Sequence, residues 1–261
     1  MSTPLLDKSE TRIRRMFGAI APTYDLLNHV LSCNVDRYWR WKTTRLVPPA
    51  RKGAILDVCT GTGDLALAYW RAAGGQVNVI GADFCSEMLS LARRKAARKR
   101  ASNVRFVQAD AQNLPFAANQ FQIVCVAFGL RNISDYRRGL AEMVRVAQPT
   151  GQVVILEFSR PSNSLWGRLY CWYFRRILPC VGQLISGHSA YHYLPASVLE
   201  FPDGEALAQE MRQAGLENVW FRPFAFRIAT LYVGTKPGAS QQARASTAAT
   251  QKHQVLPRAM P

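Results

Sequence analysis

The chain has 261 residues, 48% of them hydrophobic, which is enough to bury one large core with some appendages. We find no apolar run near the roughly twenty residues that cross a bilayer, and no signal-peptide pattern in Met1 to Glu10, so we expect neither a membrane span nor export. The 33 Lys+Arg against 17 Asp+Glu give a net charge of +16, which predicts attraction to polyanions such as nucleic acid or an anionic membrane surface.

The cysteine pattern argues against a metal site. The six cysteines are Cys33, Cys59, Cys85, Cys125, Cys171 and Cys180. They form no Cys-x-x-Cys pair and have no histidine at metal spacing. We therefore expect reduced, mostly buried thiols in a cytoplasmic protein, and no bound metal.

Three helices are predicted before the first strand, over 10–19, 24–31 and 37–46. Pro22 separates the first two, and Thr23 is a suitable N-cap for the second. Pro48 and Pro49 end the third. Residues 1–50 are thus free to fold over the strand ends as a helical lid, or they cover an edge of the sheet; the pattern favours neither.

From residue 51 onward, strands alternate with helices. Strands are predicted over 54–59, 77–82, 104–108, 121–127, 152–158, 219–222 and 228–234, the fifth introduced by a turn over 149–151. Helices are predicted over 63–73, 86–100, 136–147 and 203–214. This alternation predicts an α/β domain with a seven-stranded, mostly parallel sheet, helices on both faces and a final hairpin-like pair. A basic run over 93–100 is typical of a solvated helix face, where the helix dipole favours cations near the C-terminus.

Two segments interrupt or follow this core domain of residues 51–236. The insertion 164–202 interleaves aromatic and arginine residues over 165–178, until Pro179 breaks the helix. This composition suits a membrane interface, and equally a lid that packs its aromatics inward and turns its arginines to water. Residues 237–261 lack bulky apolar side chains, which predicts a disordered tail.

The stretch 54–67 combines a buried strand, a glycine turn and a helix start. Asp57 is the exception in an otherwise apolar strand, and Gly61 and Gly63 let the backbone adopt unusual dihedrals and a ligand come close. A dinucleotide site would have a third glycine where this chain has Ala66. Carboxylates at Asp57 and Asp64 disfavour a diphosphate and favour a cation.

Two more strand ends place acids at the same edge of the sheet. Asp83 follows the glycine turn by about twenty residues, where such folds place the acid that accepts both ribose hydroxyls. Asp110 and Ala111 follow the third strand, in position to contact an adenine amine. A ligand with ribose, adenine and a cationic sulfonium but no phosphate is S-adenosylmethionine. The pattern therefore predicts a Rossmann-like class I methyltransferase that uses S-adenosylmethionine, with an empty tight turn as the alternative.

Three peptides resemble the ubiquinone/menaquinone biosynthesis C-methyltransferase family, over about residues 10–236 in all. They are 24–32 continuing to Trp39, Phe128-Gly-Leu-Arg-Asn132, and 145–151 continuing to Leu156-Glu157-Phe-Ser159. The resemblance implies methyl transfer from S-adenosylmethionine to a ring carbon of a reduced prenylated quinol. It would convert demethylmenaquinol to menaquinol, or carry out the equivalent step on a benzoquinol precursor of ubiquinone.

The resemblance also implies roles for residues. By match to the family motif, the cofactor contacts would be Thr62, Asp83, Asp110 and Ala111. On the loop after the fourth strand, Arg131 would stabilise the phenolate or order a water, and Asn132 would hydrogen-bond a quinol oxygen. Tyr24 and Asp25 are candidates for the lid side of the site. An ion pair that ties its loop to the lid is the alternative for Arg131.

Other functions stay open at this stage. The positive charge suggests methylation of RNA or of another small molecule, although the Asn-Pro-Pro-Tyr type of motif used on flipped bases is missing, so we expect no nucleic acid partner. A binding protein without catalysis is a third option. A prenylated substrate predicts a cytoplasmic protein in peripheral contact with the anionic inner face of the membrane, and a homodimer is an open option.

Overall fold

The computed structural model of the protein describes residues 10–32, 34–160 and 196–238. The main helices there are α1 Glu10–Leu31, α2 Val35–Leu46, α3 Asp64–Ala72, α4 Ser86–Arg98, α5 Tyr136–Val146 and α9 Glu205–Gln213. The strands are β1 Ala54–Val58, β2 Val79–Asp83, β3 Val104–Gln108, β4 Phe121–Ala127, β5 Ala147–Phe158, β6 Glu217–Phe224 and β7 Ala229–Thr235. The predicted insertion helix over 165–178 and the tail from 239 lie outside the described residues.

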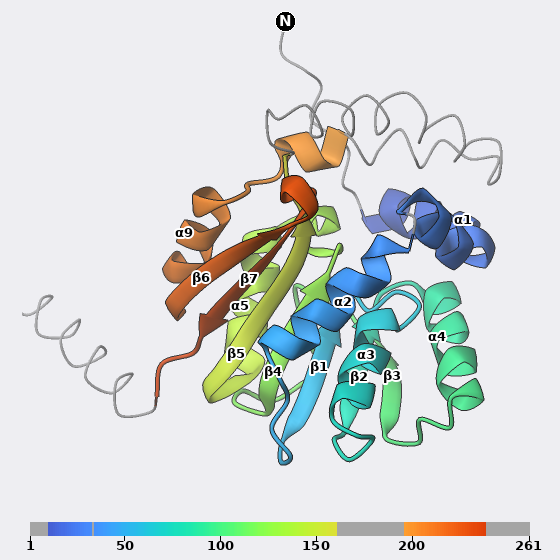
Figure 1. Ribbon diagram of the computed structural model, residues 1–261, viewed down its shortest axis with the longest axis horizontal. Helices are drawn as coiled ribbons and strands as arrows, with labels where there is room; N and C mark the ends of the chain where they lie inside the picture. Colours follow the sequence, from blue (N-terminus) through green and yellow to red (C-terminus); the bar gives the residue numbers. More distant parts are fainter. Residues whose placement is uncertain (1–9, 33, 161–195, 239–261) are drawn as a thin grey trace, which may run out of the picture.

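The seven strands of the described residues form one sheet in the order β3-β2-β1-β4-β5-β7-β6 (Figure 1). The first five strands run parallel, and β7 pairs antiparallel with both β5 and β6. The predicted mostly parallel sheet with a final hairpin-like pair is confirmed. Because β2 and β4 flank β1 on opposite sides, the connections diverge at the carboxyl end of β1, the place where ligands bind in such sheets.

Helices cover both faces of the sheet, which explains why its central parallel strands are mostly apolar. Ile55 of β1 packs in a cluster with Trp39 of α2, on the face that α2 and α3 cover. The next residue, Leu56, packs in a second cluster with Leu140 of α5. Asp57 shares the face of Ile55, since side chains alternate along a strand. A carboxylate is therefore enclosed in an apolar layer.

The N-terminal segment differs from the prediction. Residues 10–31 form the single helix α1, and the predicted break at Pro22 with a cap at Thr23 is wrong. A proline removes one hydrogen bond from a helix but does not end it where the turns on both sides are held. Here Ala21 packs with Met88 of α4, and Tyr24 joins the same cluster. This packing lies between segments distant in the sequence, so local propensity could not reveal it.

The start of β5 also differs from the prediction. The strand begins at Ala147, directly after α5, and the turn predicted at 149–151 lies within it. Thr150 has a positive φ of 63°, so the turn-like backbone is real. It stays in the sheet because the Thr150 amide donates to the Lys236 carbonyl, and the Lys236 amide donates back to Gly151. The end of β7 thus extends the ladder past the irregular residue.

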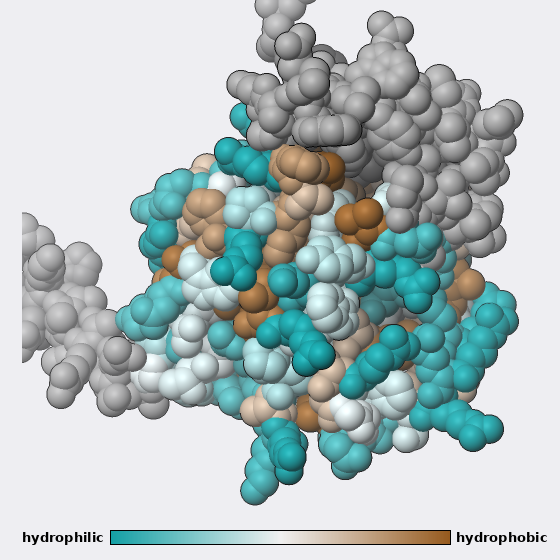
Figure 2. Space-filling view, in the orientation of Figure 1, coloured by the Kyte–Doolittle hydropathy of each residue, from teal (hydrophilic) through white to brown (hydrophobic). Residues whose placement is uncertain are grey.

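Figure 2 shows the face that α2, α3 and α4 cover, in the same orientation as Figure 1. Strongly hydrophilic side chains gather over these helices, with smaller hydrophobic areas between them. Within residues 10–32, 34–160 and 196–238, no helix has both the length and the apolar character that a membrane span needs.

Three of the cysteines fall in the described residues, and all three are free thiols. Cys85 and Cys125 are buried, whereas Cys59 is partly exposed. Burial raises the pKa of the Cys125 thiol well above its ordinary value, so this thiol is protonated at neutral pH. The prediction of reduced, mostly buried thiols is confirmed for these three.

Candidate active site

A cavity lies at the carboxyl ends of the parallel strands, where the chain connections diverge. Segments that follow β1, β2, β3 and β4 form its walls, together with parts of α1 and α4. The sequence-predicted residues that line it are Tyr24, Gly61, Asp83, Asp110, Ala111 and Asn132. The fold therefore brings together six candidates that are spread over more than one hundred positions of the sequence.

The other five candidates lie outside the residues that line this cavity. They are Asp25, Asp57, Thr62, Gly63 and Arg131. Each contacts or neighbours a residue of the wall, and the paragraphs below describe these contacts. Their part in the site is therefore support of the wall, and direct ligand contacts for them stay predictions.

Asp83 ends β2 and points its carboxylate at the glycine turn. Its Oδ2 accepts from the Gly61 amide at 2.8 Å, and its Oδ1 accepts from the Cys85 amide at 2.9 Å. Burial raises the pKa of Asp83, and the amides of Cys85 and Gly61 oppose that shift. A carboxylate has about four acceptor positions, so Asp83 keeps capacity for a ligand diol after both amides are bound.

Asp110 follows β3 and holds the loop after that strand, which forms part of the cavity wall. Its Oδ1 accepts from the Gln112 backbone amide at 2.8 Å. The side chain of Gln112 in turn accepts from the Ser134 hydroxyl at 3.0 Å and from the Asp135 amide at 3.1 Å. The loops after β3 and β4 are thus tied together at the mouth of the cavity, with Ala111 buried between them.

The glycine turn after β1 gives the cavity its floor. Gly61 and Gly63 have φ values of 55° and 82°, which favour glycine. A Cβ on Gly61 would meet nothing within 4 Å, so the turn leaves open space on the cavity side. A Cβ on Gly63 would come within 2.9 Å of the Phe106 ring of β3, so this glycine lets the turn pack against the sheet.

The buried Asp57 side chain holds this turn in place through hydrogen bonds. It is 1% exposed, and its Oδ2 accepts from the Thr60 hydroxyl at 2.6 Å and from the Ala66 amide at 3.0 Å. The Cys125 thiol of β4 lies 3.6 Å from its Oδ1. Burial raises the pKa of Asp57 to about 7, although these hydrogen bonds favour the charged form. The carboxylate thus fixes the turn and the start of α3.

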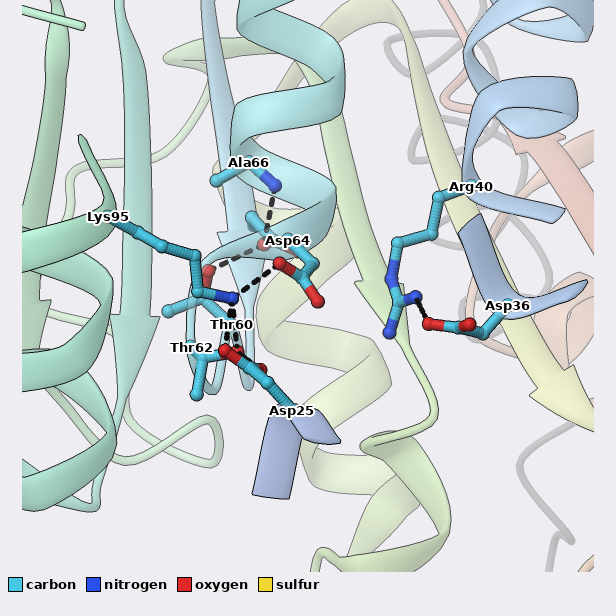
Figure 3. Close-up of polar contacts among 9 residues, drawn as sticks. Asp25, Asp36, Arg40, Thr60, Thr62, Asp64, Ala66 and Lys95 are labelled. Atoms are coloured by element: carbon cyan, nitrogen blue, oxygen red, sulfur yellow. Dashed lines mark hydrogen bonds and ion pairs between the residues drawn. The ribbon is translucent and has the colours of Figure 1, made fainter. Parts of the chain in front are cut away.

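Asp25 and Thr62 meet in a polar cluster beside the turn (Figure 3). The Thr62 hydroxyl donates to Asp25 Oδ1 at 2.6 Å, which joins α1 to the glycine turn. Lys95 of α4 lies 2.8 Å from the other Asp25 oxygen and 2.5 Å from Asp64 Oδ1. Its ammonium also donates to the Thr62 hydroxyl at 2.9 Å. Carboxylates from two helices, α1 and α3, therefore converge on one cation of a third helix, α4.

Arg131 is buried in an ion pair, with a different partner from the one that the sequence suggested. Its Nη1 lies 2.6 Å from Glu157 Oε1, near the end of β5, and 2.5 Å from the Phe128 carbonyl. The guanidinium also lies over the Phe158 ring, 5.3 Å from its centroid. A pair between this loop and the predicted lid is therefore wrong, and Arg131 ties the loop to the sheet.

Asn132 lines the cavity, and its amide group has hydrogen-bonding capacity that the described residues do not use. Its Nδ2 donates to the Phe128 carbonyl at 3.4 Å, a long hydrogen bond. Its Oδ1 is buried, as is Arg131 Nε, and neither atom has a hydrogen-bond partner in the described residues. Buried polar atoms without partners are costly, so both are candidates for contact with a ligand or an ordered water.

Sequence reasoning missed most of the apolar wall. The missed residues that line the cavity include Ile13, Phe17, Cys59, Phe84, Met88 and Phe128. It also missed Lys95 and Glu157, the partners of Asp25 and Arg131. A lysine in a basic helix and a glutamate at a strand end are ordinary residues in sequence, and only the tertiary contacts distinguish them.

The cavity fits S-adenosylmethionine on the chemistry of its walls. Asp83 offers a carboxylate for a ribose diol, and Phe84 and Met88 offer apolar surface for a planar base. A diphosphate site would favour lysine or arginine, and the described residues that line the cavity include neither. Tyr24 supplies an aromatic face, which suits a sulfonium, and Asp110 supplies a second carboxylate, which suits the amine of adenine. No group of His, Cys, Asp or Glu in the described chain could hold a metal ion.

The sequence matches the model of the ubiE/COQ5 methyltransferase family over residues 5–236. It is 46% identical over 236 residues to a demethylmenaquinone methyltransferase of Deinococcus radiodurans, covering 89% of this chain and 97% of that protein. It is 47% identical over 223 residues to a demethylmenaquinone methyltransferase of Thermus thermophilus, covering 85% and 100%.

The fold is also similar to solved structures. A methyltransferase from Thermotoga maritima, described as dependent on S-adenosylmethionine and a possible histamine N-methyltransferase, superposes with a TM-score of 0.62 at 17% identity. The superposition covers 86% of this chain and 99% of that one. At this identity the likeness concerns the fold alone.

Proposed function

The chain belongs to the ubiE/COQ5 methyltransferase family, and from this premise we propose that it converts demethylmenaquinol to menaquinol. It is an S-adenosylmethionine-dependent methyltransferase, and the relatives at 46% and 47% identity are both named for demethylmenaquinone. We prefer the naphthoquinol to a benzoquinol precursor of ubiquinone for that reason. Other relatives, such as one from Geotalea daltonii at 43% identity, have names that include both quinones.

The observation that supports this function best is the composition of the cavity. Its wall combines a carboxylate at the end of β2, Asp83, with an amide whose oxygen lacks a partner in the described residues, Asn132. The first suits the ribose of the methyl donor, and the second suits a hydroxyl of a quinol. The apolar side chains of Phe17 and Phe128 complete a wall suited to an aromatic ring.

S-Adenosylmethionine, when bound, supplies a methyl group on a sulfonium, which the quinol ring carbon accepts. The ring carbon becomes a good nucleophile when a phenolic proton leaves, so the protein has to stabilise the phenolate. Asn132 can donate to or accept from the quinol hydroxyl from the cavity wall. Arg131, the residue directly before Asn132, places a positive charge behind the cavity wall. Its Nε has no hydrogen-bond partner in the described residues. Over the whole reaction the C–S bond of the donor breaks as the new C–C bond forms, S-adenosylhomocysteine leaves, and the ring proton is released to solvent. The phenolate regains the proton that it lost, which restores the quinol.

Methyl transfer from labelled S-adenosylmethionine tests the proposal. The purified protein is incubated with a reduced demethylmenaquinone analogue, a demethoxy-benzoquinol or bulk tRNA, each under reducing conditions. We expect label in the naphthoquinol. Label mainly in the benzoquinol would reassign the ring, label only in tRNA would reject quinol methylation, and binding of the donor without any transfer would support a non-catalytic protein.

The role of Asn132 has its own test in the same assay. We expect Asn132→Ala to lower kcat about 100-fold, the usual effect of losing one oxyanion donor, with little change in the KM for S-adenosylmethionine. A rise in that KM with kcat unchanged would instead assign Asn132 to donor binding.

We also propose that the protein contacts an anionic membrane surface through α2, because its substrate has a prenyl chain. Tyr38 and Trp41 of α2 are 51% and 49% exposed, with ring centroids 5.8 Å apart. Arg45 lies over the Trp41 ring at 5.8 Å, and the exposed Arg37 and Arg71 line the same groove between α2 and α3. Aromatic rings beside arginines are suited to the headgroup region of a bilayer. Figure 2 shows this face, with its hydrophilic side chains over α2 and α3.

Sedimentation with lipid vesicles tests the surface. We expect vesicles with anionic lipid to retain the protein at low salt, and Tyr38→Ala/Trp41→Ala to weaken retention about tenfold. Trp220→Ala on β6 is the matched control, since Trp220 is also exposed, at 39%, on another element. Equal retention of both variants, or preference for RNA over vesicles in competition, would reject this surface.

A further inference from the structure

Helix α1 forms one wall of the cavity and packs against α4. It supplies Ile13, Phe17 and Tyr24 to the cavity. In the described residues, its contact with α4 centres on a small cluster of Ala21, Cys85 and Met88, with Phe17 and Tyr24 packed against it. This cluster is separate from the two large clusters that cover the faces of the sheet. The polar contacts beside this cluster therefore contribute to the position of α1.

Lys95 and Thr62 both contact Asp25 and so attach α1 to α4 and to the glycine turn (Figure 3). Lys95 Nζ lies 2.8 Å from Asp25 Oδ2 of α1, 2.5 Å from Asp64 Oδ1 at the start of α3 and 2.9 Å from Thr62 Oγ1 of the glycine turn. Its side chain is 20% exposed, and those of Asp25 and Asp64 are 34% and 25% exposed. The cluster is thus shielded more than an ordinary surface pair, which strengthens its electrostatic interactions.

Lys95 joins two carboxylates that belong to different helices. Asp25 and Asp64 lie within hydrogen-bond distance of the same ammonium nitrogen. Asp64 also interacts electrostatically with Arg40 of α2. Loss of Lys95 therefore removes the ion pair that links α1 to α4 and leaves the charges of two neighbouring carboxylates less compensated.

We propose that Lys95 is a positioning residue that sets the affinity for S-adenosylmethionine by holding α1 against the glycine turn. This rests on the proposed function, since it assumes that the cavity holds the methyl donor. Lys95 does not line the cavity, so its action is indirect. It keeps Tyr24, which lies directly before Asp25 in the chain, in the wall together with Asp83 and Asp110.

Binding and kinetics of Lys95→Met test the proposal, with Arg94→Met, an exposed cation on the same helix, as the matched control. We expect the Kd for S-adenosylhomocysteine and the KM for S-adenosylmethionine to rise about tenfold or more in Lys95→Met, the range for a lost hydrogen bond to a charged group. The kcat at saturating donor should change less than about threefold. Amide hydrogen exchange in α1 should speed up, while exchange in the sheet stays unchanged. Lys95→Arg, which keeps the cation, should recover part of the affinity.

A double-mutant cycle with Asp25→Asn isolates the contact. If Lys95 acts through Asp25, the two substitutions together should weaken binding clearly less than the product of their separate effects. Independent effects, or wild-type affinity in Lys95→Met, would overturn the proposal. If Lys95→Met does not fold, Asp25→Asn alone has to show the same loss of affinity and faster exchange of α1. Failure of the wild-type protein to bind the donor would instead overturn the proposed function.

Discussion

Asp57 is a buried carboxylate without a cationic partner at hydrogen-bond distance in the described residues, and its protonation affects stability. Burial raises its pKa from 3.8 to about 7 in the folded protein. Between these two values the folded protein holds a proton that the unfolded chain has lost. The free energy of unfolding therefore falls as the pH rises from about 4 to about 7, by up to about 4 kcal/mol for this group.

Asp57→Asn should remove this pH dependence, because an amide stays neutral and its oxygen can still accept from Thr60 and Ala66. Urea unfolding of the ligand-free protein at pH 5 and pH 8 checks it. We expect wild type to lose stability between the two and the variant to lose much less. The same loss in both proteins would show that another group titrates in this range.

Arg131 and Glu157 are a buried pair, with side chains 6% and 1% exposed. We expect Arg131→Met to destabilise the protein by about 3–5 kcal/mol, because it leaves the Glu157 carboxylate buried without its cation. The double variant Arg131→Met/Glu157→Gln should recover much of that stability but not the methyl transfer. Thermal unfolding and the labelled assay separate the two effects. Wild-type turnover in the double variant would reduce the pair to a structural role.

At the scale of an element, the turn between β1 and α3 contains two glycines with different tasks. Both have positive φ, so alanine at either position strains the backbone by roughly 1–2 kcal/mol. Gly61 faces open space on the cavity side, whereas a Cβ on Gly63 would lie 2.9 Å from Phe106 and 3.2 Å from Ala92. Gly61 therefore leaves space where a ligand could bind, and Gly63 lets the turn pack closely against the Phe106 ring of β3.

The two alanine variants should therefore fail in different ways. Gly63→Ala should lose about 1–3 kcal/mol more stability than Gly61→Ala, because its Cβ overlaps the Phe106 ring. Gly61→Ala should fold and lose affinity for S-adenosylhomocysteine, since its methyl group enters the cavity. Thermal melts and calorimetric titration check both. Equal stability losses, or unchanged affinity in Gly61→Ala, would contradict this division.

At the scale of the whole molecule, ligand binding should stabilise the fold, because the cavity joins segments from both sides of β1 and from α1. At about 100 times its Kd, S-adenosylhomocysteine should add about 2.7 kcal/mol to the free energy of unfolding and raise Tm by roughly 5 °C or more. Differential scanning calorimetry at several ligand concentrations checks it, and Gly61→Ala should show a smaller shift. A Tm that does not depend on ligand concentration would contradict the assignment of the cavity.

The sequence by itself determined the sheet, the family and the edge of the sheet where the cavity lies. Parallel strands buried on both faces are mostly apolar, so the strands were predicted in the right places, although β5 begins five residues before its predicted start. The acids Asp83 and Asp110 had to fall at the same edge, because the carboxyl ends of parallel strands meet there. The family prediction, based on motifs such as Phe128-Gly-Leu-Arg-Asn132, is confirmed.

Only the tertiary structure decided which residues form the cavity wall and which stand behind it. Asp57, predicted as a ligand contact, braces the turn, and Arg131 pairs with Glu157 of β5. The continuity of α1 through Pro22 could not be predicted either, because it depends on packing against the distant helix α4. Such outcomes depend on contacts between distant segments, as between Lys95 and Asp25, whose strength comes from burial and charge at one point in space. Local propensity and residue spacing contain no information about which distant side chains come into contact.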